Sequence, residues 1–196
     1  MSYLTLGSLY LEFPEHQNAS GFYRDLNLEN ATTTTRYQVD DVTYTRTTFA
    51  SFTDNVIIMH IKASKANALN FTIAYNFPLV HKVNVQNDKL TVTCQGKEQE
   101  GLKAALRAEC QIQVKTNGTL RPAGNTLQIN EGTEATLYIS AATNYVNYQD
   151  VSADESRRTS EYLKRATQIP YEKALKNHIA YYKKQFDRVR LTLPAG

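Results

Sequence analysis

The amino-acid sequence predicts a mainly β protein, an antiparallel super-sandwich of two large sheets with about ten strands, followed by two C-terminal α-helices. Three observations support this fold. Short segments alternate apolar and polar residues, turn-forming Asn, Asp, Gly and Pro residues separate them, and no helical spacing interrupts them before residue 150.

The first strand predictions differ in clarity. Residues 9, 11 and 13 are apolar and the run stops at Pro14, as expected of a half-buried strand that ends in a loop. Residues 22–28 are mixed, and their pattern favours no one structure. Residues 56–61 form an apolar run, which predicts a central strand covered on both faces. Residues 69–77 alternate cleanly up to Pro78.

Two hairpins follow from turn residues. Asp40-Asp41 would close a two-residue loop that pairs Val39 with Val42 and Tyr37 with Tyr44 on one face, because Asp tolerates the left-handed conformation. Asn87-Asp88 separates the alternating segments 83–85 and 90–94 in the same way. Asn117-Gly118 marks the next turn, and residues 127–129 and 135–141 complete the strands.

Residues 102–114 show the longest alternation in the chain. Thirteen residues at about 3.3 Å each would span about 43 Å, so either the sheet is large or a bulge breaks the strand. If residues 96–101 form the preceding hairpin loop, Cys94 lies opposite Lys103 and not opposite Cys110. We therefore expect Cys94 and Cys110 to be two free core thiols.

Two helices end the chain. Ser152, Asp154 and Glu155 form a polar cap with first-turn acids, which predicts a helix to about Gln168, and Pro170 separates it from the last one. In residues 171–191 a 4-3-4-3 spacing lines up apolar residues along one side. This predicted apolar side consists of Leu175, Ile179, Tyr182, Phe186 and Val189, and it must dock on a sheet or on something outside this sequence.

Charge and composition argue against several classes of function. Of the 22 basic and 19 acidic residues, six and two lie in 171–191, which leaves 16 and 17 in a nearly neutral body. No basic patch interleaves with aromatic residues, so we expect no nucleic-acid partner. No segment is apolar enough for membrane insertion, and no secretion signal is visible at the N-terminus.

The sequence predicts no catalytic, cofactor or metal site. His16, His60, His81 and His178 lack metal-ligand spacing, and His60 is expected to be a satisfied core residue. No phosphate-binding loop or nucleophile elbow is present. The acidic residues available for sugar chemistry each have a local explanation as turn, cap or solvated side chain. They are Glu12, Glu15, Asp25, Asp40, Asp41, Asp154 and Glu155.

Several stretches match, in order and spacing, those of a known enzyme family. They are residues 6–13 (LGSLYLEF), 23–28 (YRDLNL), 42–46 (VTYTR), 49–51 (FAS), 54–56 (DNV), 141–145 (AATNY), 147–148 (NY), and Tyr171, His178, Tyr182, Phe186, Arg188, Val189 and Leu191. This ordered set resembles glycoside hydrolase family 95, the family of α-L-fucosidases and some α-L-galactosidases.

The resemblance implies a domain organisation. In that family an N-terminal super-sandwich is joined by a helical linker to an (α/α)6 barrel, which carries the residues for an inverting hydrolysis. Residues 1–150 would be the sandwich without the opening strands that normally precede Leu4, and residues 151–196 the linker. The resemblance then implies a linker face between sandwich and barrel, made of Leu175, His178, Ile179, Tyr182, Phe186 and Val189. No catalytic residue carries over. A bacterial parent would imply a periplasmic or secreted location.

Two functions of different classes remain open at this point. The chain is a non-catalytic accessory domain of a fucosidase-type hydrolase, inactive alone, whose partners are the barrel of its parent and, through it, an oligosaccharide or polysaccharide. Alternatively, it is a self-sufficient carbohydrate-binding sandwich that uses exposed Tyr residues in the absence of Trp. Related sandwich-plus-barrel hydrolases and phosphorylases that act on other sugars are a third possibility.

Overall fold

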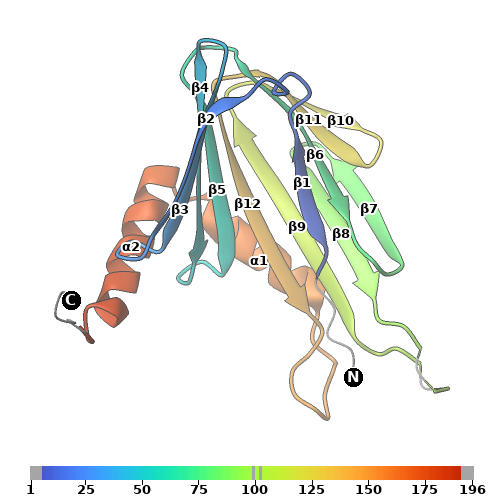
Figure 1. Ribbon diagram of the computed structural model, residues 1–196. Coiled ribbons are helices and arrows are strands. Elements are labelled where there is room, and N and C mark those ends of the chain that lie inside the picture. The colour runs from blue at the N-terminus through green and yellow to red at the C-terminus, as the bar shows by residue number, and fades with distance from the viewer. Residues whose placement is uncertain (1–5, 99, 102, 191–196) are drawn as a thin grey trace.

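A computed structural model describes residues 6–98, 100–101 and 103–190, and it is mainly β with two helices at the C-terminal end (Figure 1). The strands are β1 (Ser8–Glu12), β2 (Ser20–Asn27), β3 (Thr32–Val39), β4 (Val42–Ser51), β5 (Val56–Ala63), β6 (Leu69–Asn76), β7 (His81–Gln86), β8 (Lys89–Gln95), β9 (Arg107–Thr116), β10 (Thr119–Ala123), β11 (Thr126–Gly132) and β12 (Glu134–Thr143). The helices are α1 (Glu155–Thr167) and α2 (Tyr171–Phe186).

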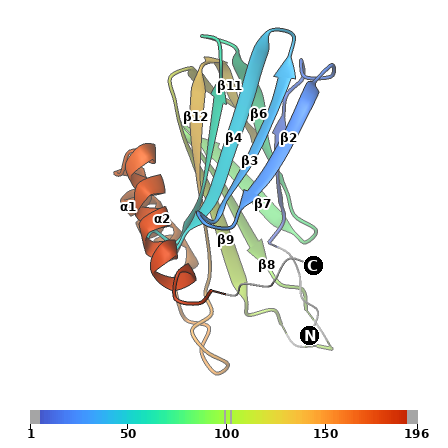
Figure 2. The same cartoon turned by 60° about the vertical axis from the view of Figure 1, so that its left-hand side comes forward.

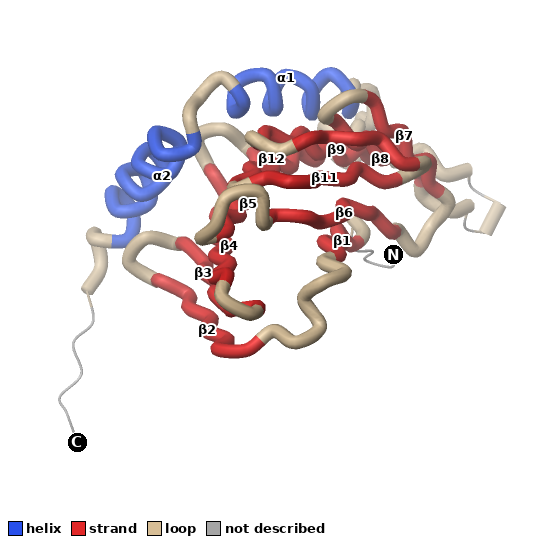
Figure 3. The backbone as a smooth tube through the Cα atoms, turned by 90° about the horizontal axis from the view of Figure 1, so that it is seen from above, coloured by secondary structure: helices blue, strands red, loops and turns tan. Residues whose placement is uncertain are grey.

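The strands form two antiparallel sheets of unequal width. The smaller has four strands in the order β1-β6-β11-β10, and the larger has eight in the order β2-β3-β4-β5-β12-β9-β8-β7. Viewed from above, the larger sheet curls at its β2 end toward β1 (Figure 3). The predicted antiparallel sandwich is therefore confirmed. Of its 12 strands, the sequence patterns do not resolve β2 and β10.

The main core lies between the two sheets. Ile73 and Ile129 of the smaller sheet and Ile112 and Leu137 of the larger one are fully buried in it. Each belongs to an alternating segment, so the same pleat that puts these residues inside turns their neighbours outward. The alternation in residues 69–76 is confirmed in β6, where Leu69, Phe71 and Ile73 are buried.

Both predicted hairpins are present with the expected register. Val39 pairs with Val42 and Tyr37 with Tyr44 across Asp40, whose φ of 50° is left-handed. Asn87 takes a φ of 54° in the β7–β8 turn. The turn at Asn117-Gly118 leads from β9 in the larger sheet to β10 in the smaller one, so it connects sheets and does not close a hairpin.

The prediction of one strand over residues 102–114 was wrong in its start. Leu102 lies outside the described residues, and β9 begins only at Arg107. Cys94 pairs with Ala108, not with Lys103, so the connection between β8 and β9 is longer than the predicted six-residue loop. The alternating sequence pattern continues through residues 104–106, but these residues are not paired with a neighbouring strand. Cys94 and Cys110 are both free thiols, as expected, with Cys110 buried and Cys94 half-buried.

A second, smaller core lies on the outer face of the larger sheet, where the helices cover it (Figure 2). Alternate residues of β5 point to opposite sides: Ile61 enters the sandwich core, and Ile58 packs under the helices. This explains the apolar run at residues 56–61. The strand is covered on both faces along most of its length, although 44% of Ile57 is exposed. Phe49 and Tyr138 join Ile58 beneath the helices.

Candidate interdomain interface

Helix α1 is fixed to the outer face of the larger sheet. Leu163 and Ala166 are buried against the cluster that contains Ile58 and Tyr138. Asp154 caps the helix by accepting a 2.8 Å hydrogen bond from the backbone N–H of Arg157. These contacts confirm the predicted helix start.

An ion pair ties β9 to the first turn of α1. The guanidinium of Arg107 donates from Nε and Nη2 to the two carboxylate oxygens of Glu155, at 2.7 and 3.2 Å. Hydrogen bonding to Arg107 lowers the pKa of Glu155. Because both groups lie near the surface, the pair contributes little to stability and serves mainly to orient the helix start.

Asn144 holds together the segment that leads from the sandwich into α1. Its side chain is fully buried, accepts from the backbone N–H of Arg107 at 2.8 Å, and donates to the carbonyls of Ala105 and Val151 at 2.9 and 2.8 Å. Arg158 on α1 donates to the carbonyls of Thr143 and Tyr145, at 2.8 and 2.9 Å. Asn144 thus joins the start of β9 to both ends of the loop that leads into α1.

A buried polar group fixes the position of α1 along the sheet. Glu109 on β9 is buried, and one of its carboxylate oxygens accepts from Thr159 Oγ1 at 2.7 Å and from Gln111 Nε2 at 2.6 Å. Gln111 also donates to Ser160 Oγ at 3.1 Å. A shift of α1 along the sheet would leave these buried polar side chains without hydrogen-bond partners. They therefore specify one docking position for the helix.

A polar pocket of about 550 Å³ lies where the α1–α2 turn crosses the sheet. His60 faces it, and its Nδ1 is 2.9 Å from Thr136 Oγ1 while its ring stacks on Tyr171 with centroids 4.1 Å apart. Burial lowers the pKa of His60, although the negative charges of Glu134 and Glu172 act to raise it. The imidazole is satisfied by these neighbours, although it lies under the helices and outside the sandwich core.

Helix α2 is held on the sandwich by contacts up to Tyr182. His178 is buried, its ring stacks on Phe49 at 4.7 Å, and its Nε2 lies 3.1 Å from the carbonyls of both Asn30 and Ala31. Because both partners are acceptors, Nε2 must carry the proton. Tyr182 donates from its hydroxyl to the carbonyl of Leu28 at 2.8 Å.

The predicted linker face divides along the helix into an attached half and a free half. His178 is buried, and Leu175, Ile179 and Tyr182 are half-buried. By contrast, 42% of Phe186 and 83% of Val189 are exposed, and the helix ends at Phe186. Ala174 and His178 are the buried residues of α2, so its attached side is rotated slightly from the predicted one.

Exposed apolar side chains gather around the free half of α2. Phe52, in the turn after β4, stacks on Tyr181 with centroids 5.0 Å apart and planes 13° apart, yet 69% of it is exposed. Phe186 stacks on Tyr182 at 5.2 Å, and Leu28 lies at the carbonyl that Tyr182 binds. We call Leu28, Phe52 and Phe186 the α2 patch. Nothing among the described residues covers it.

The other residues considered in the sequence do not gather into a site. His16 lies among Phe13, Tyr37 and Tyr44, with Nδ1 2.8 Å from the Tyr37 hydroxyl, and His81 Nδ1 is 2.9 Å from the Leu79 carbonyl. The described residues contain no cluster of three or more His, Cys, Asp and Glu side chains able to hold a metal ion. Neither described helix is both long and apolar enough to cross a membrane.

Sequence reasoning missed one aromatic feature, the loop between β12 and α1. Tyr148 is 86% exposed, and Tyr145 and Val146 are about half exposed. The loop itself projects at the bottom of Figure 1. Asp150 and Asn147 brace this loop through backbone hydrogen bonds of 3.1 Å. The sequence of this loop contains aromatic residues outside any alternating or helical pattern, and this pattern could have indicated that they are exposed.

The chain is similar to known glycosyl hydrolase family proteins in sequence and to a solved structure in fold. Residues 1–148 match the family model described as glycosyl hydrolase family 65, N-terminal domain. An Arabidopsis thaliana protein named alpha-L-fucosidase 2 is 25% identical over an alignment that covers 97% of this chain and 26% of the plant protein. A structure described as "Putative kojibiose phosphorylase from human microbiome" superposes with a TM-score of 0.56 at 10% identity, over 84% of this chain and 24% of that one.

The chain thus spans about a quarter of the length of these two relatives. The low identity to the solved structure shows a shared fold alone. The family match covers all the described strands, from β1 through β12, and the first part of the loop beyond them. The expected glycoside hydrolase N-terminal domain is therefore confirmed, and the chain belongs to the family of glycosyl hydrolase family 65 N-terminal domains.

Proposed function

We propose that this chain is the non-catalytic N-terminal part of a family 95-type α-L-fucosidase, which hydrolyses α1,2-linked fucosyl groups in glycans with inversion. Residues 1–150 form its sandwich domain, and residues 151–196 form the linker toward an (α/α)6 catalytic barrel. The family match supports the N-terminal domain of a glycosyl hydrolase, and the similarity to a plant protein named alpha-L-fucosidase 2 supports the choice of a fucosidase. The role of the chain is to support the barrel.

The observation that carries the proposal is the uneven burial of α2. His178 and Tyr182 attach the helix to the sandwich, while Phe186 at its end and Val189 just beyond it are exposed to solvent. Exposed apolar side chains that lie together usually mark an interaction surface. The α2 patch lies beside the end of the helix, where the next domain of a longer chain would begin.

Two measurements test this proposal. Incubated alone with a fucosyl-α1,2-galactose substrate, the chain should release no fucose, and turnover like that of a complete enzyme would overturn it. The genomic reading frame after Gly196 should encode a barrel with acidic residues suited to an inverting hydrolysis. A stop codon directly after Gly196 would contradict the proposed linker.

The exposed loop aromatics Tyr145 and Tyr148 favour a second candidate, a self-sufficient carbohydrate-binding module. Aromatic faces can stack on sugar rings, and this loop is braced in one conformation. Calorimetric titration with the same fucosylated substrate separates the two functions. Micromolar binding that is lost in Tyr148→Ala would support the module, and absence of binding would support the accessory domain.

A further inference from the structure

The outer face of the larger sheet changes from apolar to polar along β4, β5 and β12. Phe49 and Tyr138 both pair with Ile58, and this row of three lies in the apolar cluster under the helices. The strand pleat turns every second residue to the same side, so the next rows on this face are also opposed residues. They are polar, and in pairing order they are Thr47, His60 and Thr136, then Thr45, Lys62 and Glu134.

These two polar rows form the floor of the pocket of about 550 Å³. Neighbouring strands lie about 4.8 Å apart and alternate residues about 6.8 Å apart, so the floor measures about 10 by 7 Å. The turn between the helices and the start of α2 supply a more apolar wall, which includes Ile169, Pro170 and Tyr171. The volume is in the range of small-molecule sites. A polar floor beside an apolar wall suits a ligand that has both kinds of surface.

The charged groups of the pocket balance one another. Lys62 and Lys115 line it, and so do Glu134 and Glu172. Burial lowers the pKa of His60, which leaves the imidazole neutral near pH 7. Two ammonium and two carboxylate groups therefore surround a neutral ring. This balance favours an uncharged ligand over an anion or a cation.

Several polar groups of the pocket are available to such a ligand. His60 Nδ1 lies 2.9 Å from Thr136 Oγ1, whereas its Nε2 is 4.0 Å from a carboxylate oxygen of Glu134, too far for a hydrogen bond. The Lys62 ammonium and the Glu172 carboxylate form no ion pair with a residue that the structure describes. Donors and acceptors are thus both present, as a ligand with several hydroxyl groups requires.

We propose that this pocket binds one neutral sugar residue of a glycan. A sugar ring combines hydroxyl groups at its edge with an apolar C–H face, and the floor is large enough for one ring. The hydroxyl groups hydrogen-bond to Lys62, His60 and Glu172, and the C–H face packs on Ile169 and Pro170. The inference uses residues of this chain alone and does not rest on the proposed fucosidase activity.

Nuclear magnetic resonance titration of the isotope-labelled chain tests the pocket, with L-fucose and D-glucose as probes. Saturable shifts of the Thr47, His60 and Thr136 amides are expected with either sugar, with a Kd of about 1–10 mM for a ligand of so few atoms. Inorganic phosphate at the same pH and ionic strength should bind about tenfold more weakly, because Glu134 and Glu172 repel it. Tighter binding of phosphate than of both sugars, or no saturable shift below about 100 mM sugar, would overturn the proposal.

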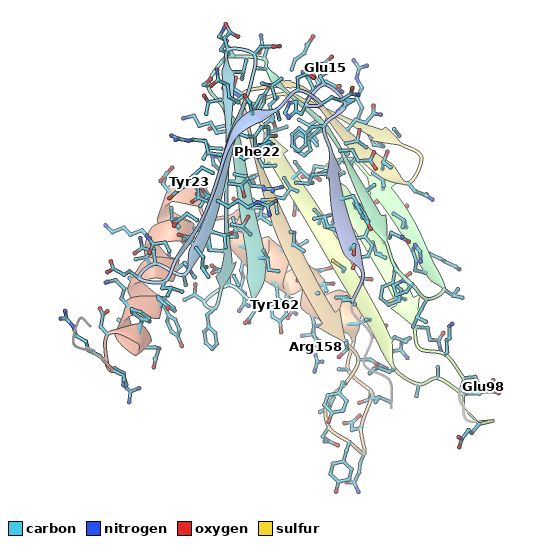
Figure 4. The ribbon with its side chains drawn as sticks, in the orientation of Figure 1. Glu15, Phe22, Tyr23, Glu98, Arg158 and Tyr162 are labelled. Carbon is cyan, nitrogen blue, oxygen red and sulfur yellow. The ribbon has the colours of Figure 1, made fainter. Side chains whose placement is uncertain are left out.

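A pair of charge variants checks that the balance of charge selects the ligand. Glu172→Gln removes an exposed carboxylate from the pocket, so it should raise the sugar Kd about threefold and strengthen phosphate binding. Glu98→Gln removes the same charge from an exposed loop on the opposite side of the molecule from α2 (Figure 4). It should change neither affinity, and equal effects of the two substitutions would contradict the assignment.

A second pair of variants blocks the pocket by size. Thr45→Phe places a large ring on the floor and should abolish the shifts, and Phe suits an exposed strand position. Thr93→Phe, on the exposed face of β8, should leave them intact. An unchanged urea midpoint shows that each variant is folded, and Glu172→Gln decides the matter if Thr45→Phe is not. Full binding by a folded Thr45→Phe variant would refute this location.

Binding in this pocket can be distinguished from both functions proposed above. Tyr148→Ala should leave it unchanged, and its millimolar strength differs from the micromolar binding expected of a self-sufficient module. A stop codon after Gly196 would contradict the proposed linker but would not alter the shifts at Thr47 and His60. Failure of the sugar titration would likewise leave the barrel proposal standing.

Discussion

The imidazole of His178 stacks on the ring of Phe49, with centroids 4.7 Å apart and planes inclined by 29°. The contact joins the middle of α2 to the outer face of β4. It also positions Nε2 to donate to the carbonyls of Asn30 and Ala31 in the β2–β3 turn. One side chain therefore links the helix to both a strand and a turn.

Replacing His178 with Ala should lower the free energy of unfolding by about 2–3 kcal/mol, because the change removes a buried ring and leaves two half-buried carbonyls without this donor. Hydrogen exchange should rise more in α2 than in α1. Lys176→Ala, on the exposed side of the same helix, should change stability by less than about 0.5 kcal/mol. Equal effects of the two substitutions would show that α2 is not anchored through His178.

Asn144→Ala should destabilise the chain by about 2–4 kcal/mol in urea unfolding, since one buried amide serves three backbone groups. Asn144→Asp should not rescue it, because a carboxylate cannot donate to the carbonyls of Ala105 and Val151. Gln149→Ala, exposed in the neighbouring loop, is the matched control. A mild effect at Asn144 would contradict its role as the link between the sandwich and α1.

Gly118 lies where the chain passes from one sheet to the other, against the backbone of the β11–β12 turn. A Cβ there would come within 2.6 Å of the Asn130 carbonyl oxygen and the Gly132 nitrogen. Gly118→Ala should therefore cost about 1–3 kcal/mol of stability, measured by thermal or urea unfolding. Gly21→Asn should cost far less, because Gly21 has open space around it and Asn tolerates its φ of +61°.

The two thiols should react slowly while the protein is folded. Burial raises the pKa of Cys110 to about 12 and also raises the pKa of Cys94. At about pH 8 the reactive thiolate of Cys110 is then a fraction of about 10⁻⁴. Mass spectrometry after iodoacetamide treatment should find Cys110 unmodified in native protein and both thiols modified in guanidinium. Rapid native labelling of Cys110 would show that β9 opens readily.

Stability should decline as the pH falls from about 7 to about 5. Burial keeps the folded-state pKa of His60 below 6.5, so the unfolded chain takes up the proton first and is favoured as pH drops below that value. Urea unfolding at a series of pH values measures the decline. The His60→Asn variant should show a smaller decline in stability, and the His81→Asn variant should show the full decline. Stability that rises on acidification would contradict the predicted direction.

Local patterns predicted most of the sandwich, and tertiary context explains the exceptions. The sequence patterns did not predict β2 and β10, because both are edge strands. β2 is mostly exposed, and β10 contains Arg121 and Pro122. The start of β9 was misplaced because alternation does not require a paired neighbour. Register within the two short hairpins was predictable, since the two-residue turn determines which residues face each other.

The helical interface was predictable as an amphipathic segment but not in its orientation. Spacing alone placed Leu175 and Ile179 at the centre of the apolar side, whereas Ala174 and His178 are the buried residues. A small residue lets α2 approach the sheet, and the carbonyls of the β2–β3 turn require a donor. Those carbonyls lie nearly 150 positions away in sequence, so helical periodicity contains no information about them.

The cluster that α1 covers has a consequence for how the chain can be divided. Phe49, Ile58 and Tyr138 belong to the sandwich, yet Leu163 and Ala166 of α1 keep water from them. Limited proteolysis that removed everything after residue 150 would leave an apolar face open on β4, β5 and β12. The smallest piece that unfolds as one cooperative unit therefore extends through the end of α1. We expect a cleavage to be tolerated only on the C-terminal side of that helix.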